Sequence, residues 1–230
     1  MTPHAAQAAP HAGGSPISML TLHTYFRSSA SYRVRIALGL KGLSWRAVPV
    51  HLVRNGGEQH RADFLALNPS GLVPVLRDGE VTVTQSLAII EYLEELQPEP
   101  NLVGRTPAER ARVRSLSLDI ACEIHPLNNL RVLGYLTGEL GLDEARKLAW
   151  YRHWVETGLQ AFERRLSPDD AFCAGDRPTM ADCCLVPQVF NARRFGADLS
   201  AVPKVAAIAE RCAEIEAFRA AEPGVQADAA

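Results

Sequence analysis

The sequence predicts a mixed α/β unit followed by an all-helical unit. Strand-like segments fall between residues 20 and 83, and helical patterns separate them. The chain is then interrupted at Gln97-Pro98-Glu99-Pro100, where prolines remove backbone donors and restrict the residues before them. Beyond that point Ala, Leu, Arg and Glu recur with helical periodicity. We therefore expect an α/β unit over residues 19–99, a helical unit over residues 104–222, and a disordered tail over residues 1–18.

Within the first unit the expected order is β-α-β-α-β-β-α. Alternation predicts strands over residues 20–25, 45–52, 73–76 and 81–83, and Asp78-Gly79 suits the turn of the last hairpin. Helices are expected over residues 34–40, 64–67 and 86–96. Hydroxyl groups near Ser28 and Ser86 can cap the first and the third helix, and Lys41-Gly42 can end the first.

The second unit is expected to contain helices alone. Apolar periodicity predicts them over residues 107–124, 127–140, 143–166, 180–194 and 203–213. Thr179 precedes the fourth helix and Asp182 follows three positions later, which is the pattern of a capping box.

Composition indicates a globular protein and excludes several functions. Hydrophobic residues make up 47% of the chain and charged residues 22%, which is enough for a core. A formal net charge of -2 does not favour electrostatic binding to nucleic acid, and no apolar run approaches the ~20 residues of a membrane span. The five cysteines form no Cys-x-x-Cys pair and the histidines have no metal-binding spacing. We expect a cytoplasmic protein with reduced cysteines, no metal, and neither nucleic acid nor membrane as a partner.

A cluster of hydroxyl groups lies where the first strand gives way to the first helix. Ser28, Ser29 and Ser31 occupy this junction, where free backbone N–H groups and the helix dipole favour an anion. A thiolate is such an anion, and a serine hydroxyl that donates to sulfur lowers the pKa of a thiol. The serines can instead simply cap the helix, and the pattern alone favours that interpretation.

A second cluster consists of Val73-Pro74 and Gln85-Ser86. Val73 precedes a proline in an extended segment, so its backbone can pair with a peptide-like ligand, helped by a cis peptide at Pro74. Ser86 at a helix start can hold a carboxylate through its hydroxyl and N–H groups. A plain hairpin followed by a capped helix explains the same residues, and the pattern alone favours it.

Taken together and in this order, the two clusters resemble the glutathione transferase superfamily from about residue 19 to the C-terminus. Several long segments narrow the resemblance to the zeta class, namely residues 28–38, 66–76, 84–93, 124–130 and 191–195. The resemblance implies the glutathione transferase fold, in which a thioredoxin-like N-terminal domain binds glutathione and an all-α C-terminal domain binds substrate.

The resemblance also implies which residues bind glutathione. They are Ser28, Ser29, Val73, Pro74, Gln85, Ser86, His125 and Asn129. One of the two serines would activate the thiol, and the first is favoured. The valine would pair with the cysteinyl backbone, the Gln-Ser pair would hold the γ-glutamyl end, and the last two residues would reach the site from the helical domain.

Two positions depart from what the resemblance implies. Glu58 stands where some relatives place a glutamine near the glycyl carboxylate. Because one carboxylate repels another, we leave Glu58 out of the site and expect Gln59 or His60 near the glycyl end instead. Many zeta enzymes have a cysteine between the motif serines, and here that position is Ala30. Glutathione would then supply the only nucleophilic sulfur of the loop.

The implied activity is the glutathione-dependent conversion of maleylacetoacetate to fumarylacetoacetate in tyrosine breakdown through homogentisate. The glutathione thiolate would add reversibly to the cis double bond, which rotates before elimination. Maleylpyruvate from gentisate breakdown is the competing substrate. General glutathione conjugation, dehalogenation of α-halo acids and a non-catalytic glutathione-binding module are the competing functions.

Three arginines complete the implied site. The substrate is a small dianion, which guanidinium groups can grip bidentately. Arg27 precedes the serine loop, Arg131 follows the His125 segment, and Arg194 lies within the segment at residues 191–195. Each of them can equally be a solvated helical arginine. Family members of this build are homodimers, so we expect one here.

Overall fold

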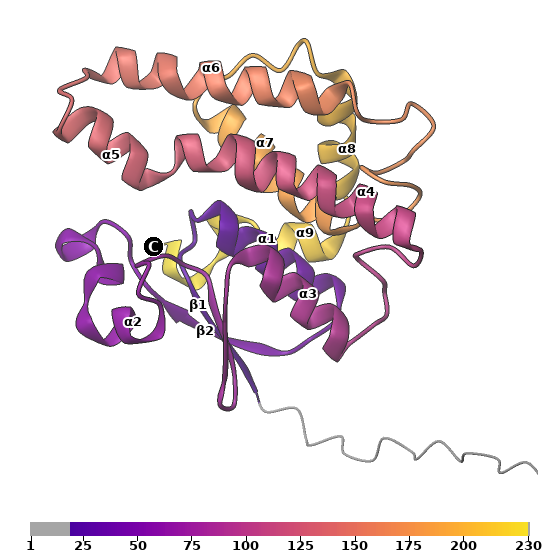
Figure 1. The fold of residues 1–230 in the computed structure, drawn as a ribbon, viewed down its shortest axis with the longest axis horizontal. Coiled ribbons are helices and arrows are strands. Elements are labelled where there is room, and N and C mark those ends of the chain that lie inside the picture. Colours follow the sequence, from indigo (N-terminus) through magenta and orange to yellow (C-terminus); the bar gives the residue numbers. More distant parts are fainter. Residues whose placement is uncertain (1–18, 230) are drawn as a thin grey trace, which may run out of the picture.

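The computed structural model of the protein describes residues 19–229. The tail expected over residues 1–18 lies outside the described residues. A sheet with its helices forms one half of the molecule and a group of helices forms the other (Figure 1). The predicted fold class, a mixed α/β unit followed by helices, is therefore what the structure contains.

The first half is a four-stranded mixed sheet. Its strands are β1 (Leu20–Thr24), β2 (Trp45–Pro49), β3 (Val75–Asp78) and β4 (Val81–Thr84), in the order β2-β1-β3-β4. β1 runs parallel to β2 and antiparallel to β3, and β3 and β4 form the expected hairpin. Helices α1 (Ser29–Leu40), α2 (Ala62–Leu67) and α3 (Ser86–Leu96) alternate with the strands. Two short 3-10 turns, Arg54–Gly56 and Glu58–His60, lie between β2 and α2.

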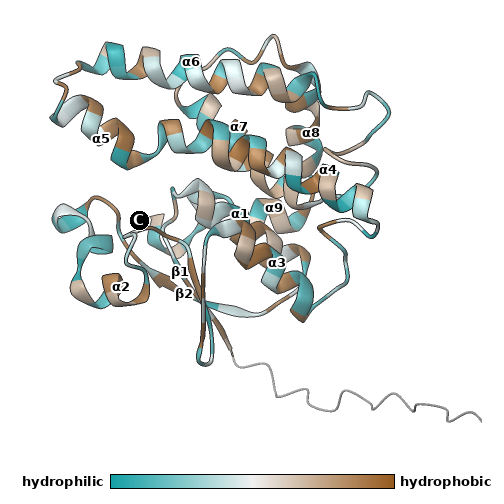
Figure 2. Cartoon of the chain, viewed as in Figure 1, coloured by the Kyte–Doolittle hydropathy of each residue, from teal (hydrophilic) through white to brown (hydrophobic). Residues whose placement is uncertain are grey.

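The second half contains α4 (Pro107–Leu118), α5 (Leu130–Gly138), α6 (Glu144–Glu163), α7 (Met180–Arg194), α8 (Pro203–Ala213) and α9 (Glu216–Ala220). The capping box expected at the start of α7 is formed, because Asp182 Oδ2 accepts from the Thr179 N–H at 2.7 Å. Figure 2 shows α3 largely apolar, whereas α6, on the outside of the helical half, carries many hydrophilic residues. In the part of the chain from residue 19 to residue 229, no helix combines the length and apolar character of a membrane span.

Two helices of this half differ from the sequence prediction. The helix expected over residues 107–124 is α-helical only as far as Leu118, continues as a π-helix over Asp119–Ile124, and passes into a 3-10 turn over His125–Asn128. Pro126 lacks an N–H and cannot continue the helical bonding, so α5 begins at Leu130 and not at residue 127. Gly158 of α6 lets the widened turn pack closely against that helix. The side chain of Ile124 occupies the space that a Cβ on Gly158 would need. The helix α9 was not predicted.

Helix α1 lies at the centre of the molecule. It packs against α3, α7 and α9, and its residues from Ser31 to Leu38 are all buried. A helix that is buried on every side shows little amphipathic periodicity, which explains why the sequence predicted only its second half. The C-terminal residues return to this region, where the Phe26 N–H donates to Asp228 Oδ2 at 2.9 Å (Figure 1).

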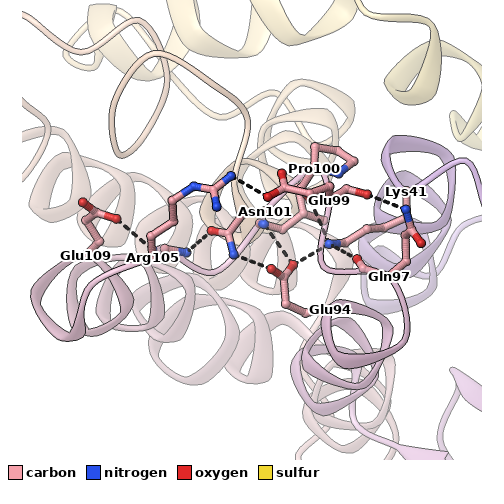
Figure 3. Close-up of polar contacts among 10 residues, drawn as sticks. Lys41, Glu94, Gln97, Glu99, Pro100, Asn101, Arg105 and Glu109 are labelled. Carbon is pink, nitrogen blue, oxygen red and sulfur yellow. Dashed lines mark hydrogen bonds and ion pairs between the residues drawn. The ribbon is translucent and has the colours of Figure 1, made fainter. Parts of the chain in front are cut away.

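A buried ion pair joins the C-terminal end of α1 to the segment that links the two halves (Figure 3). Lys41 Nζ lies 2.5 Å from Glu94 Oε2 and donates to the carbonyl oxygens of Gln97 and Pro100 at 2.6 and 2.7 Å. Glu94 also accepts from the Asn101 amide and from the Leu102 N–H. Every polar atom of the pair has partners, so the network fixes the linking segment against α1 and α3.

We expect Glu94→Ala to lower the free energy of unfolding by about 3–5 kcal/mol, because it leaves the buried Lys41 ammonium without its counter-charge. The matched control is Glu91→Ala on the same helix. Its ion pair with Arg114 is largely solvated, with side chains 40% and 46% exposed, so removing it should cost less than about 1 kcal/mol. Chemical denaturation measures both values, and equal losses would show that the Lys41 network is no stronger than a surface pair.

Candidate active site

A pocket of about 330 Å³ opens between the two halves of the molecule. The first half contributes α1, the loop before β3 and the start of α3, and the second half contributes the end of α4 and the irregular turns that follow it. Seven of the residues expected in the site line it, namely Val73, Pro74, Gln85, Ser86, His125, Asn129 and Arg131. Four expected residues do not, namely Arg27, Ser28, Ser29 and Arg194.

The serines lie at the N-terminus of α1, next in the chain to the pocket residue Ala30. Ser28 is the N-cap, and its Oγ accepts from the Ser31 N–H at 3.2 Å. Ser29 Oγ accepts from the Asn191 amide of α7 at 2.7 Å. A hydroxyl that accepts through its oxygen still has its proton to donate. Capping and donation to a thiolate are therefore compatible roles for these serines.

The loop before β3 presents Val73 to the pocket. The Val73–Pro74 peptide is cis, as the sequence suggested. Asn68, which sequence reasoning missed, also lines the pocket and holds the loop in shape. Its amide donates to the Leu72 carbonyl at 2.7 Å, and its Oδ1 accepts from the Ser70 N–H at 3.2 Å. The backbone of Val73 is thereby held in one position beside the sheet.

The start of α3 forms another wall of the pocket. Gln85 is the N-cap residue, with φ 69° and ψ 119°, and its side chain makes no capping hydrogen bond. A positive φ is costly for a residue with a Cβ, and such strain gathers at ligand-binding sites. Ser86 follows as the first helical residue and is buried. The uncapped N–H groups of this helix start suit a carboxylate.

Positive charge is concentrated on one side of the pocket. Arg33 of α1, which was not among the expected residues, lines the pocket together with Arg131 and His125. Burial, followed by the charges of Arg33 and Arg131, lowers the pKa of His125 to about 3. The imidazole is therefore neutral at pH 7 and adds no charge of its own. Asn129 caps α5 by accepting from the Arg131 N–H at 3.1 Å.

The other two expected arginines lie elsewhere, next to Tyr25. The Arg27 guanidinium lies 4.8 Å from the centre of the Phe26 ring, and that of Arg194 lies 4.9 Å from the centre of the Phe195 ring. Burial raises the pKa of Tyr25, and the charges of Arg27 and Arg194 oppose this rise. Neither of these two arginines lines the pocket that contains Arg131.

The candidates for the glycyl end also lie outside this pocket. Glu58 Oε2 accepts from the His51 N–H at 2.7 Å, so this carboxylate already has a backbone partner. Gln59 is buried, and its amide donates to the Leu52 carbonyl at 3.3 Å. His60 lies beside it, with its Nε2 3.1 Å from the Gln59 amide nitrogen.

The structure also brings a protein thiol into the pocket. Cys122 lies in the π-helical segment and is exposed. It lines the same pocket as Ala30, the position at which many zeta enzymes have a cysteine in the serine loop. The π-turn gives it this position, and helical periodicity alone could not have shown it. In the described range, residues 19–229, no three His, Cys, Asp or Glu side chains form a candidate metal site.

Family models for the glutathione S-transferase N-terminal and C-terminal domains match residues 27–96 and 144–221. This chain belongs to the glutathione transferase family. The glutathione transferase fold predicted from the sequence, with its thioredoxin-like and all-α parts, is thereby confirmed.

Relatives of this glutathione transferase bear isomerase names. Maleylacetoacetate isomerase of Rhizobium meliloti is 53% identical over 206 residues, or 88% of this chain and 95% of that protein. A holo structure of maleyl pyruvate isomerase, a bacterial glutathione S-transferase of the zeta class, matches with a TM-score of 0.88 and 45% identity over 91% of this chain and 100% of that one. Maleylacetoacetate isomerase from Methylobacterium extorquens AM1, solved with bound malonate and glutathione, matches with a TM-score of 0.87 and 41% identity over 91% and 99%. The resemblance to the zeta class is thereby confirmed.

We expect iodoacetamide to alkylate Cys122 before any other cysteine, because the thiols of Cys173, Cys183, Cys184 and Cys212 are buried. Burial also raises the pKa of Cys184 to about 11, which disfavours its reactive thiolate. Peptide mass spectrometry after brief treatment gives the order of modification. S-Methylglutathione should slow the reaction by filling the pocket.

The Cys122→Ser variant should lose the fast modification, and Cys184→Ser should keep it. Equally fast alkylation of a buried cysteine would contradict the assignment of Cys122 to an open pocket wall.

Proposed function

We propose that this protein is a glutathione-dependent cis–trans isomerase that converts maleylacetoacetate to fumarylacetoacetate in the breakdown of tyrosine through homogentisate. One observation carries the proposal. A single pocket joins the N-terminal ends of α1 and α3 to cationic and polar side chains of the helical half. The names and bound ligands of the matched relatives point to the same reaction.

The residues of the pocket fit glutathione, which has a peptide backbone and a carboxylate at each end. Val73 offers backbone groups for the central cysteinyl unit, and the uncapped start of α3 with Gln85 and Ser86 suits the γ-glutamyl carboxylate. His125 and Asn129 reach the same pocket from the helical half. Glutathione, when bound, supplies the thiol that adds reversibly to the cis double bond.

The chain's own residues would prepare that thiol and the substrate. Ser28 is less buried than Ser29, so its hydroxyl proton is the better placed to donate toward a ligand sulfur. Such a donor favours the thiolate, as does the positive end of α1, whose first turn contains no acidic residue. Arg27, Arg131 and Arg194 would attract the two carboxylates of a small cis-enedioyl acid. A relative that was solved with bound malonate, a small dicarboxylate, and glutathione supports this use of the site.

We also infer a cytoplasmic homodimer. Val81 of the first half and Leu140 of the second are apolar side chains with 46% and 57% of their surface exposed, which suits contact of both halves with a partner subunit. A thiol cofactor needs a reducing compartment. Sedimentation of the purified protein as a single protomer would contradict the dimer.

The decisive experiment follows the ultraviolet absorbance of maleylacetone and of maleylpyruvate, each with and without a catalytic amount of glutathione. We expect turnover of maleylacetone that depends on glutathione without consuming it. Equal rates without glutathione, or no turnover of either compound, would contradict the isomerase. Faster turnover of maleylpyruvate would favour the competing substrate, and stoichiometric loss of glutathione would indicate conjugation or dehalogenation.

Ser28→Ala should lower turnover by about tenfold to a hundredfold, because it removes a hydrogen bond to a charged sulfur. Thr106→Ala is the matched control, since Thr106 caps α4 away from the pocket. Both variants lose an N-cap and should lose about 1 kcal/mol of stability. If Ser28→Ala retains full activity while Ser29→Ala abolishes it, the second serine is the thiol activator.

A further inference from the structure

Two buried arginines on α1 differ sharply in their surroundings. Arg33 and Arg35 are each 2% exposed and lie two positions apart. Arg35 donates to the carbonyl oxygens of Ala221, Tyr25 and Phe26 at 3.1, 3.3 and 3.0 Å. Arg33 donates only from Nη1, to Ser86 Oγ at 3.2 Å. Its Nε and Nη2 have no hydrogen-bond partner among residues 19–229.

A buried guanidinium with two nitrogens that make no hydrogen bond destabilises the folded protein, because the group has lost water without gaining a counter-ion. Burial lowers the pKa of Arg33 accordingly. No described carboxylate forms an ion pair with it in residues 19–229, and the neighbouring His125 is neutral. Arg35 shows that the same helix can satisfy a buried arginine where its role is structural. The incomplete bonding of Arg33 therefore points to an anion that the polypeptide itself does not provide.

The position of Arg33 indicates where that anion binds. Its side chain lines the pocket together with Gln85 and Ser86, at the uncapped start of α3. Ser86 Oγ accepts from Arg33, so the hydroxyl proton of Ser86 is left to donate into the pocket. The guanidinium thus both orients this hydroxyl and adds positive charge behind it.

We propose that Arg33 is a positioning residue for the α-carboxylate at the γ-glutamyl end of glutathione, acting through Ser86 and through its own uncompensated charge. The inference rests on the proposed function, since it takes glutathione as the ligand. Affinity for that carboxylate is obtained at the expense of the stability of the ligand-free protein. A structural arginine has no such trade-off.

The test compares Arg33→Met, Arg33→Lys and Arg35→Met by chemical denaturation without ligand and by calorimetric titration with glutathione. Arg33→Met should unfold at the same or a higher denaturant concentration than the wild type and should bind glutathione about tenfold or more weakly. Arg33→Lys keeps the positive charge without the planar guanidinium group, so it should bind glutathione more tightly than Arg33→Met and more weakly than the wild type. Arg35→Met should unfold at a clearly lower denaturant concentration.

A second probe isolates the carboxylate. 4-Aminobutyryl-Cys-Gly is glutathione without its α-carboxylate. The wild type should bind this analogue more weakly than glutathione, and Arg33→Met should weaken its binding no further. In turnover, Arg33→Met should raise the KM for glutathione and leave kcat at saturating glutathione nearly unchanged.

The outcomes separate the two proposals. If the wild type binds glutathione and Arg33→Met binds it equally well, the role of Arg33 is overturned and the proposed function stands. If the wild type does not bind glutathione, both are overturned. If Arg33→Met unfolds as readily as Arg35→Met, Arg33 is structural. If Arg33→Met does not fold, Arg33→Lys provides the test. The role is overturned if Arg33→Lys prefers glutathione over the analogue by the same factor as the wild type does.

Discussion

Helix α1 has to be buried on every side and still carry charged and hydroxyl groups, and the rest of the structure is arranged around this constraint. Its apolar residues fill the space between the sheet and the helices α3, α7 and α9. Each of its polar groups therefore needs a partner from another element. Lys41 finds Glu94 and the carbonyls of the linking segment, and Arg35 finds the carbonyls at the end of β1 and in the C-terminal segment. These bonds hold the linking segment and the C-terminal segment against one helix.

The active-site pocket follows from the same arrangement. The N-terminal ends of α1 and α3 face the helical half, and the departure from α-helical geometry after Leu118 turns Cys122 and His125 toward them. Helix starts contribute partial positive charge and free N–H groups, and Arg33 and Arg131 contribute full charges. A site of this kind recognises anionic groups without any metal ligand, which suits a tripeptide with two carboxylates and a small dianionic acid.

The arginines show how charge can be divided within one site. Arg131 and Arg33 line the pocket, whereas Arg27 and Arg194 lie beside Tyr25 and do not line it. The hydrogen bond from Asn191 to Ser29 ties this loop to α7, which also carries Arg194.

The sequence by itself determined the order of strands and helices as far as α8, the capping box at Thr179 and the two motif clusters, because caps, turns and alternation are local properties. The resemblance of several segments to the zeta class, in the same order along the chain, was enough to indicate the family and seven of the residues that line the pocket. Only the tertiary structure decided that Ser28 and Ser29 do not themselves line the pocket and that Cys122 lines the same pocket as Ala30. It also decided that two nitrogens of Arg33 lack partners while Arg35 has several. Two arginines two positions apart look alike in a sequence, since their difference lies wholly in which distant carbonyl or hydroxyl oxygens fold against them.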